Sequence, residues 1–364
     1  MRFTLLITIF SLTFAFAETD PFNLDWKGQA SFNHARSFEG SFDESSTTLR
    51  YIPQLRLDYQ FSPTTRFGLD VAVDIYNHSR GDSLIRMDVE PYRFTIRYDT
   101  PRSQYRVGLQ KINFGPARML RVLQWFDQLD VRDPLALSPG VWAGMGRYYF
   151  TNGINLRLWL MADAPDQLRD KFGSNDKWPW DYGARMEIPI PQGTLGLTIH
   201  AMDQGNASGV SEMRAALDAR VDVTVGLWSE TMISKTDNHG IQSDIFAVMG
   251  GIDYTFGIGN GLYVALESMS YHMGHLDGDM PWQVRSIAIM ANYTLGLADG
   301  LTSYIYLYDE PGAKTQVIPT IGWQHTRGNW LFYLALYDMP ELATGGNIGL
   351  PVGTGLQLNI AFNH

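Results

Sequence analysis

The sequence predicts an all-β protein, a closed antiparallel transmembrane β-barrel of about eighteen strands. Three observations predict it: alternating apolar and polar residues, connections that alternate between short and long, and the lack of an apolar run long enough for a spanning helix. The chain is 45% hydrophobic and 13% aromatic, and only 18% of its residues are charged. A soluble domain of this length usually carries more charge.

The alternation is clearest in three segments, residues 51–61, 66–75 and 92–99. In the second of them, Phe67 and Leu69 alternate with Gly68 and Asp70. Successive side chains of a strand point to opposite faces, so each segment has one apolar and one polar face. Segments of about ten residues have the length that a tilted strand needs to cross a bilayer.

The connections between these segments alternate in length along the whole chain. Long connections are expected at 35–48, 77–90, 113–141, 162–180, 203–213, 236–242, 273–281, 310–316 and 339–353, with a tight turn between each two. Transmembrane barrels have short turns at the periplasmic end and long loops at the outer end, which accounts for this pattern. The alternation blurs in Ala215–Val223 and Leu227–Lys235, so sixteen strands is the alternative.

The N-terminal segment, residues 1–17, is expected to be a cleaved signal peptide. Arg2 is followed by an apolar stretch from Leu5 to Phe16, and Ala15-Phe16-Ala17 has the small-residue spacing of a cleavage site. The mature barrel would then comprise residues 18–364, exported through the inner membrane. The chain contains no cysteine, so it has no disulfide framework.

The charged faces of the strands are expected to line the lumen, because an arginine on the lipid face near the midplane costs about 2–4 kcal/mol. Residues 18–186 hold 21 basic groups and residues 187–364 hold 6, so the basic residues gather on one side of the barrel. Two interpretations stay open, a mutually neutralising wall and a surface that favours anions. The predicted lumen-lining arginines are Arg56, Arg66, Arg93, Arg97 and Arg106.

Residues 113–141 interrupt the strand pattern and are predicted to form a helical loop that folds into the lumen. Met119, Val122 and Phe126 recur at helical spacing, and a loop this apolar needs a surface to pack against. The loop would then narrow the pore, or alternatively brace the barrel. The predicted constriction residues are Arg118, Arg121, Asp127, Asp130, Arg132 and Asp133.

This organisation resembles that of bacterial outer-membrane porins. The segment YRVGLQKINFG, residues 105–115, is similar to the "GRQ" strand of porin-type and alginate-export-type barrels. The resemblance implies an inward-folded third outer loop and contacts with membrane lipid, lipopolysaccharide and the barrel-assembly machinery. Such barrels usually end on an aromatic residue, whereas here Phe362 is followed by Asn363 and His364.

The expected function is an outer-membrane channel for small hydrophilic solutes, with anionic solutes as the narrower option, and no cofactor, metal, nucleic-acid partner or catalytic site is expected. The alternative is a barrel that exports or binds an anionic polysaccharide. An enzyme is disfavoured, because no nucleophile or zinc motif is present. The solute and the oligomeric state stay open, as does cation binding by His272, His275, Asp277 and Asp279 in an outer loop.

Overall fold

The computed structural model describes residues 21–39, 45–127, 132–163, 180–203, 210–238, 241–274, 282–340 and 350–364. The predicted signal peptide and Asp130 lie outside the described residues. Within the described residues, no helix is long and apolar enough to cross a membrane.

The described chain forms eighteen strands in a single sheet. They are β1 (Phe22–Ser37), β2 (Ser46–Ser62), β3 (Thr65–Arg80), β4 (Ser83–Asp99), β5 (Ser103–Gln110), β6 (Val141–Tyr149), β7 (Asn155–Asp163), β8 (Trp180–Ile190), β9 (Gly193–Asp203), β10 (Val210–Asp222), β11 (Gly226–Asn238), β12 (Ile241–Phe256), β13 (Leu262–Gly274), β14 (Trp282–Thr294), β15 (Asp299–Asp309), β16 (Gln316–Arg327), β17 (Trp330–Met339) and β18 (Gly353–Asn363).

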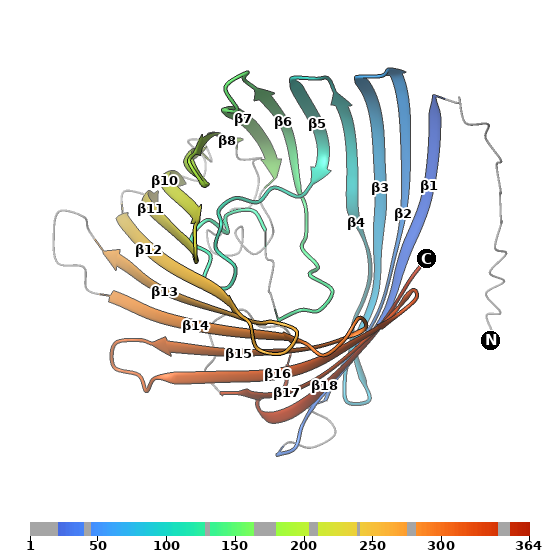
Figure 1. Ribbon diagram of the computed structural model, residues 1–364, viewed down its shortest axis with the longest axis vertical. Helices are drawn as coiled ribbons and strands as arrows, with labels where there is room; N and C mark the ends of the chain where they lie inside the picture. The colour runs from blue at the N-terminus through green and yellow to red at the C-terminus, as the bar shows by residue number, and fades with distance from the viewer. Residues whose placement is uncertain are drawn as a thin grey trace.

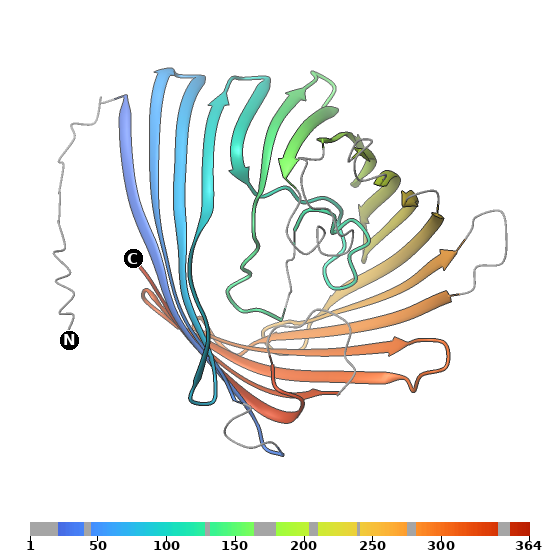
Figure 2. The same cartoon turned by 180° about the vertical axis from the view of Figure 1, so that it is seen from behind.

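The sheet closes on itself, as the sequence predicted. Each strand pairs antiparallel with its neighbours in the chain, and β1 pairs with β18 from Gln29↔Asn363 to Ser37↔Gly355. Figures 1 and 2 show the resulting ring of strands from its two sides. The two segments with blurred alternation form β10 and β11, which pair continuously from Val210↔Asn238 to Asp222↔Gly226, so the count is eighteen and not sixteen.

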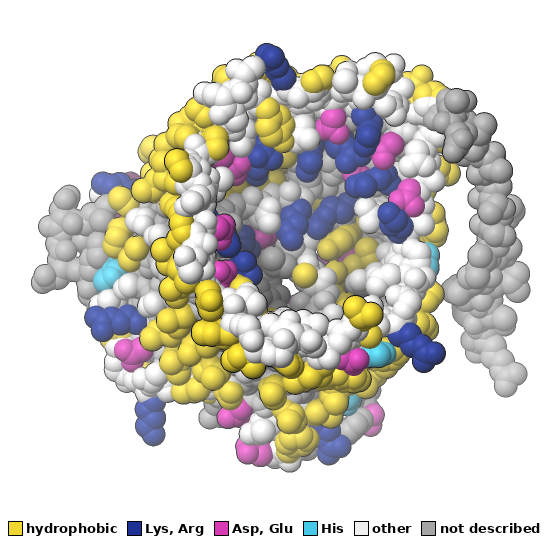
Figure 3. All heavy atoms as spheres, in the orientation of Figure 1, with side chains coloured by type: hydrophobic (Ala, Val, Ile, Leu, Met, Phe, Trp, Pro, Cys, Tyr) yellow, Lys and Arg dark blue, Asp and Glu magenta, His cyan; other side chains and the backbone are white. Residues whose placement is uncertain are grey.

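The two faces of the strands differ as predicted. Apolar residues such as Val107, Ile199 and Leu158 are more than half exposed on the outside of the barrel, where a bilayer would cover them. Figure 3 shows basic and acidic side chains within the ring and apolar side chains around it. The barrel therefore has a lipid-compatible exterior and a charged interior.

Two connections expected to be long are nearly all strand. In place of the predicted loop 77–90, β3 continues to Arg80 and β4 begins at Ser83, with Gly81 at a φ of 53° in the turn. In place of the predicted loop 236–242, β11 continues to Asn238 and β12 begins at Ile241. The strands extend because their alternation persists beyond the membrane-spanning part, as in residues 85–90, where Ile85, Met87 and Val89 alternate with charged residues.

The strands on either side of the longest described connection are short. β5, β6 and β7 contain 8, 9 and 9 residues, whereas β2, β3 and β4 contain 17, 16 and 17. Between β5 and β6, residues 111–127 and 132–140 leave the wall and enter the space that the strands enclose (Figures 1 and 2). This connection positions the candidate site.

Candidate functional site

Residues 111–140, here named the lumen loop, are described at 111–127 and 132–140. In these two stretches the chain forms turns, bends and irregular backbone, and no residue is helical. The helix predicted for this segment is thus not found in its described part. The physical reason is that its backbone N–H groups bind side chains of the wall in place of the carbonyl groups four residues earlier.

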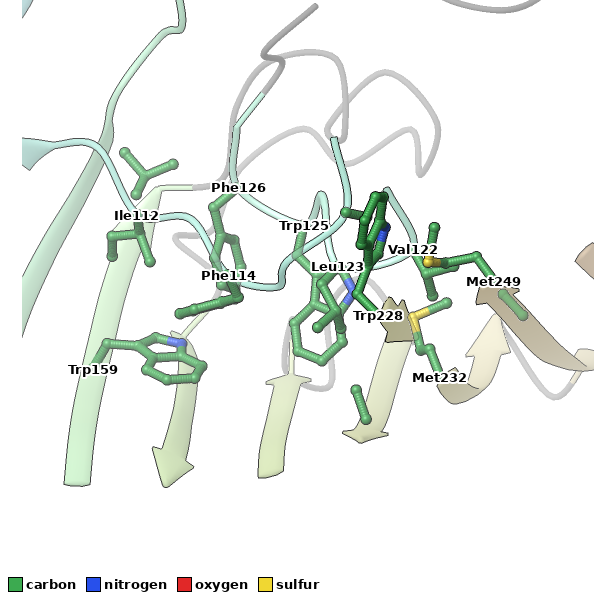
Figure 4. Packing of buried hydrophobic residues seen from close by; sticks show 14 of the residues in the cluster. Ile112, Phe114, Val122, Leu123, Trp125, Phe126, Trp159, Trp228, Met232 and Met249 are labelled. Atoms are coloured by element: carbon green, nitrogen blue, oxygen red, sulfur yellow. The ribbon is translucent and has the colours of Figure 1, made fainter. Parts of the chain in front are cut away.

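The apolar side chains of the lumen loop pack against the inner wall. Phe114, Leu123 and Trp125 are buried in one cluster with wall residues that include Trp159 of β7 and Trp228 of β11. Figure 4 shows these side chains between the loop and the strands. The same cluster contains the remaining loop residues Ile112, Ala117, Val122 and Phe126, with Met119 half-buried against it. The predicted packing of Met119, Val122 and Phe126 on the wall therefore occurs without a helix.

The loop also contacts the opposite part of the barrel. Leu120 is buried in a second cluster with Ala288 of β14, Tyr306 of β15 and Tyr337 of β17. Met119 packs against both clusters. The lumen loop therefore crosses the interior from β5 and β6 to the far wall.

Two carboxylates of the wall hold the middle of the loop. Glu230 of β11 accepts hydrogen bonds from the backbone N–H groups of Ala117 and Leu123. Glu267 of β13 accepts hydrogen bonds from three consecutive N–H groups, those of residues 118–120. Neither glutamate was predicted from the sequence. A signal existed, because the neighbours two positions away on the same strand face are apolar, Trp228 and Met232 for Glu230 and Ala265 and Met269 for Glu267.

The structure separates the predicted constriction residues into different roles. Arg118 is 38% exposed and lies 3.4 Å from Asp253, with its guanidinium over the Tyr263 ring. Arg121, by contrast, forms a 2.7 Å ion pair with Asp127, and the two side chains are 5% and 0% exposed. Arg121 and Asp127 therefore stabilise the loop from within, and the prediction that their charges project into a constriction is wrong for both of them.

The second half of the loop is held differently. Arg132 is buried with its guanidinium over the Tyr306 ring, on the far wall. Asp133 accepts hydrogen bonds from the N–H groups of Leu135 and Leu137 and so caps a turn. These contacts hold the charged groups of both residues, so neither side chain projects freely from the loop.

One basic residue of the loop has a shifted pKa. Burial lowers the pKa of the Lys111 ammonium from its ordinary value, and the nearby Arg93 and Arg121 add to the lowering. The charge of Asp127 acts in the opposite direction. Lys111 therefore lies among positive charges, at the point where the loop leaves β5.

Several predicted lumen arginines are neutralised across the strands. Arg56 is 2.6 Å from Asp70, and Arg97 is 2.6 Å from Asp58. Arg93 donates a hydrogen bond of 2.7 Å to the backbone carbonyl of Ser138, at the end of the lumen loop. These arginines stabilise the wall and anchor the loop, and their charges are partly compensated.

Arg66 and Arg106 differ from the others. Among the described residues, neither has a carboxylate within ion-pair distance, and the Nε atom of Arg106 is buried without an acceptor. Arg106 lies opposite Arg97 in the β4–β5 ladder. Arg66 lies opposite Asp99 in the β3–β4 ladder without reaching ion-pair distance, so Arg106, beside Arg97, is the less compensated of the two charges.

Further arginines continue this basic wall along the ladder. Arg147, Arg157 and Arg185 lie opposite one another on β6, β7 and β8. All three arginines contact Glu187, at 2.8, 4.0 and 2.9 Å, and Arg185 also pairs with Asp218 at 2.6 Å. Figure 3 shows the basic side chains gathered on one side of the interior.

No set of three or more potential metal ligands lies together in the part of the chain that the structure describes. Of the proposed cation loop, His272 belongs to β13, where its Nε2 is 2.9 Å from the hydroxyl of Ser270. His275, Asp277 and Asp279 lie outside the described residues.

Comparison with solved structures identifies the fold. OccAB1 of Acinetobacter baumannii matches with a TM-score of 0.58 and 10% identity, covering 94% of this chain and 96% of that one. The anion-selective porin from Comamonas acidovorans matches with a TM-score of 0.55 and 14% identity, covering 94% and 100%. OccK5 (OpdH) of Pseudomonas aeruginosa matches with 0.57 and 10%, covering 94% and 97%. No family model matches the sequence, and no curated protein does. The chain has the fold of outer-membrane porins.

Proposed function

We propose that this chain is a porin-like channel of the bacterial outer membrane through which small hydrophilic solutes diffuse, with a preference for anions, and that it catalyses no reaction. The observation that carries the proposal is the combination of a basic wall on β2–β8 with a lumen loop that contacts both sides of a closed barrel. A closed barrel of this strand number is too wide for side chains to fill, so it encloses water.

The preference for anions follows from which charges remain available to a solute. Arg66 and Arg106 have no carboxylate partner among the described residues, whereas Glu230 and Glu267 are 0% exposed and covered by loop N–H groups. A unit charge about 4 Å from an ion contributes roughly 4 kcal/mol at an effective dielectric constant near 20. Arginines without an ion-pair partner beside a water-filled lumen should therefore attract anions more than the covered glutamates attract cations.

Export of an anionic polysaccharide is the second candidate, and the lumen loop argues against it. A polymer needs a continuous wide path, whereas Leu120 and Trp125 of the loop pack on opposite parts of the wall. The basic wall by itself fits either candidate. The fold shared with a protein described as an anion-selective porin favours the small-solute channel.

The proposal is tested by the ion selectivity of variants in lipid vesicles. We expect Arg66→Gln combined with Arg106→Gln to lower the ratio of anion to cation permeability, because the two substitutions remove positive charges that have no ion-pair partner among the described residues. Arg102→Gln is the matched control, since Arg102 is exposed in the turn between β4 and β5 and should leave the ratio unchanged. Native vesicles that are impermeable to small ions, or a ratio unaffected by the double substitution, would contradict the proposal.

A further inference from the structure

We infer that Glu230 and Glu267, in their ionised form, are the positioning residues that hold the lumen loop across the barrel, so that the placement of the loop depends on protons. The inference concerns the loop itself and holds whether or not solutes pass. Only its consequence for flow rests on the proposed function.

Glu267 binds the segment of the loop that turns toward the far wall. Its Oε1 accepts hydrogen bonds from the N–H of Arg118 at 2.7 Å and from the indole N–H of Trp228 at 2.9 Å. Its Oε2 accepts from the N–H groups of Met119 and Leu120, at 2.8 and 2.6 Å. One carboxylate thus satisfies three consecutive backbone donors, which an irregular segment cannot satisfy internally.

Glu230 binds the loop backbone on both sides of residues 118–120. Its two oxygens accept hydrogen bonds of 2.9 Å from the N–H of Ala117 and of 2.9 Å from the N–H of Leu123. Gly115, at a φ of 80°, lies directly against the same carboxylate, and a Cβ atom at this position would collide with it. The chain therefore approaches the carboxylate at a residue where only glycine fits.

All six partners of the two carboxylates are N–H donors. An ionised carboxylate only accepts hydrogen bonds, whereas a protonated one carries a donor of its own. Protonation would place an O–H group against N–H groups and leave buried donors without an acceptor, which is costly. The geometry therefore fits the ionised form, and neutralisation should release the loop.

Both carboxylates and cations lie near the two glutamates, so some neighbours oppose the ionised form of the glutamates and others favour it. Asp218 of β10 lies opposite Glu230 in the ladder, but Arg185 binds Asp218 at 2.6 Å and compensates its charge. Arg121 of the loop is the cation on the other side of Glu230. Near Glu267, Arg118 lies beside Asp253, which is also 3.7 Å from Arg220 of β10 and accepts a hydrogen bond from Tyr263. In each case a cation offsets the neighbouring carboxylate.

The natural chain contains no cysteine, so a single introduced thiol reports on the loop without background. Ala117 is 7% exposed and its N–H binds Glu230, so the thiol of an Ala117→Cys variant should react slowly with a water-soluble thiol reagent at neutral pH. Adding Glu267→Gln or Glu230→Gln should raise that rate at least about tenfold, the change expected when one charge-assisted hydrogen bond is lost.

The matched control is Asp74→Asn in the same Ala117→Cys background. Asp74 is also a buried carboxylate, but it pairs with Arg50 on β2 and contacts no described residue of the loop. Circular dichroism should show a folded barrel in every variant. A comparable rate increase in Asp74→Asn would mean general loosening of the barrel and would overturn the inference.

Acidification gives a second measurement that needs no change at the glutamates. Lowering the pH of the Ala117→Cys protein to about 4, near the ordinary pKa of glutamate, should expose the thiol reversibly. The reagent used in this series must react with the protonated thiol as well as with the thiolate. The measured rate then reports only how accessible the introduced thiol is to the reagent. Protection that persists in acid and in both glutamine variants overturns the inference. If neither variant folds, the acid series decides alone. Release of the loop in a protein that conducts no ions would contradict the proposed function and leave this inference intact.

Discussion

At the scale of single residues, the position of the lumen loop depends on a few side chains whose partners are far away in sequence. Gly115 lies against Glu230, which is 115 residues later in the chain, and the loop segment 118–120 binds Glu267. The spacing of Met119, Val122 and Phe126 correctly predicted that these side chains pack on the wall, but Leu120 and Leu123, which are also buried, lie outside that stripe. It could not predict the conformation, because helical spacing does not reveal that carboxylates of the wall take the backbone donors.

We predict that Gly115→Ala displaces the loop and lowers the free energy of unfolding by more than the cost of backbone strain alone. A left-handed conformation costs a residue with a Cβ atom about 1–2 kcal/mol, and the collision with Glu230 adds to that cost. Urea titration of the barrel in lipid vesicles measures the change.

Gly312→Ala is the control for this substitution. Gly312 has the same φ of 80°, but a Cβ atom there would meet no heavy atom within 4 Å. Gly312→Ala should therefore introduce a backbone strain similar to that of Gly115→Ala, but no collision with a neighbouring side chain. Equal losses of stability in the two variants would contradict the account of Gly115.

At the scale of elements, the lumen loop is part of the core as well as an obstruction. Its side chains fill a cluster with strands β6 to β13, and Leu120 reaches a second cluster on β14 to β17. The sequence predicted an inward apolar loop from its composition, since exposed Trp125 and Phe126 would be costly in water. The role of Arg121 was predicted wrongly, because Arg121 and Asp127 were both assigned to the constriction and the spacing of the sequence does not reveal that they pair with each other.

Deleting residues 116–138 should raise single-channel conductance severalfold while the strands stay paired. The narrowest section of a water-filled path dominates its resistance, and these residues cross the lumen. Removal also leaves Glu230 and Glu267 in a wider aqueous space, where water replaces the lost N–H donors. Unchanged conductance in a variant with a native-like circular dichroism spectrum would mean that the loop is not the constriction.

At the scale of the whole molecule, the period-two pattern predicted the barrel well because each strand contacts one environment on each face. The alternating pattern also extends beyond the length that a strand needs to cross the membrane. Residues 83–90 of β4 were therefore predicted as part of a loop, although Arg86 and Asp88 alternate with apolar residues. Which arginines pair and which stay uncancelled depends on the register between strands, as for Arg97 and Asp58. A single sequence does not contain that register.

The alternation of short and long connections also predicts the orientation of the barrel. The tip of the β3–β4 hairpin, at Asp82, lies at the end that carries the lumen loop, and Asn152 lies in a turn at the other end. A thiol introduced as Asp82→Cys should be labelled from outside intact cells, and one introduced as Asn152→Cys should not. Labelling in the reverse order would invert the topology.

The central claim is that this barrel is an open channel whose passage favours anions, and current through the purified native protein in a planar bilayer tests it most directly. Under a salt gradient, we expect discrete single-channel steps and a reversal potential displaced toward the equilibrium potential of the anion. A protein that inserts but carries no current, or one whose reversal potential is displaced toward that of the cation, would contradict the account.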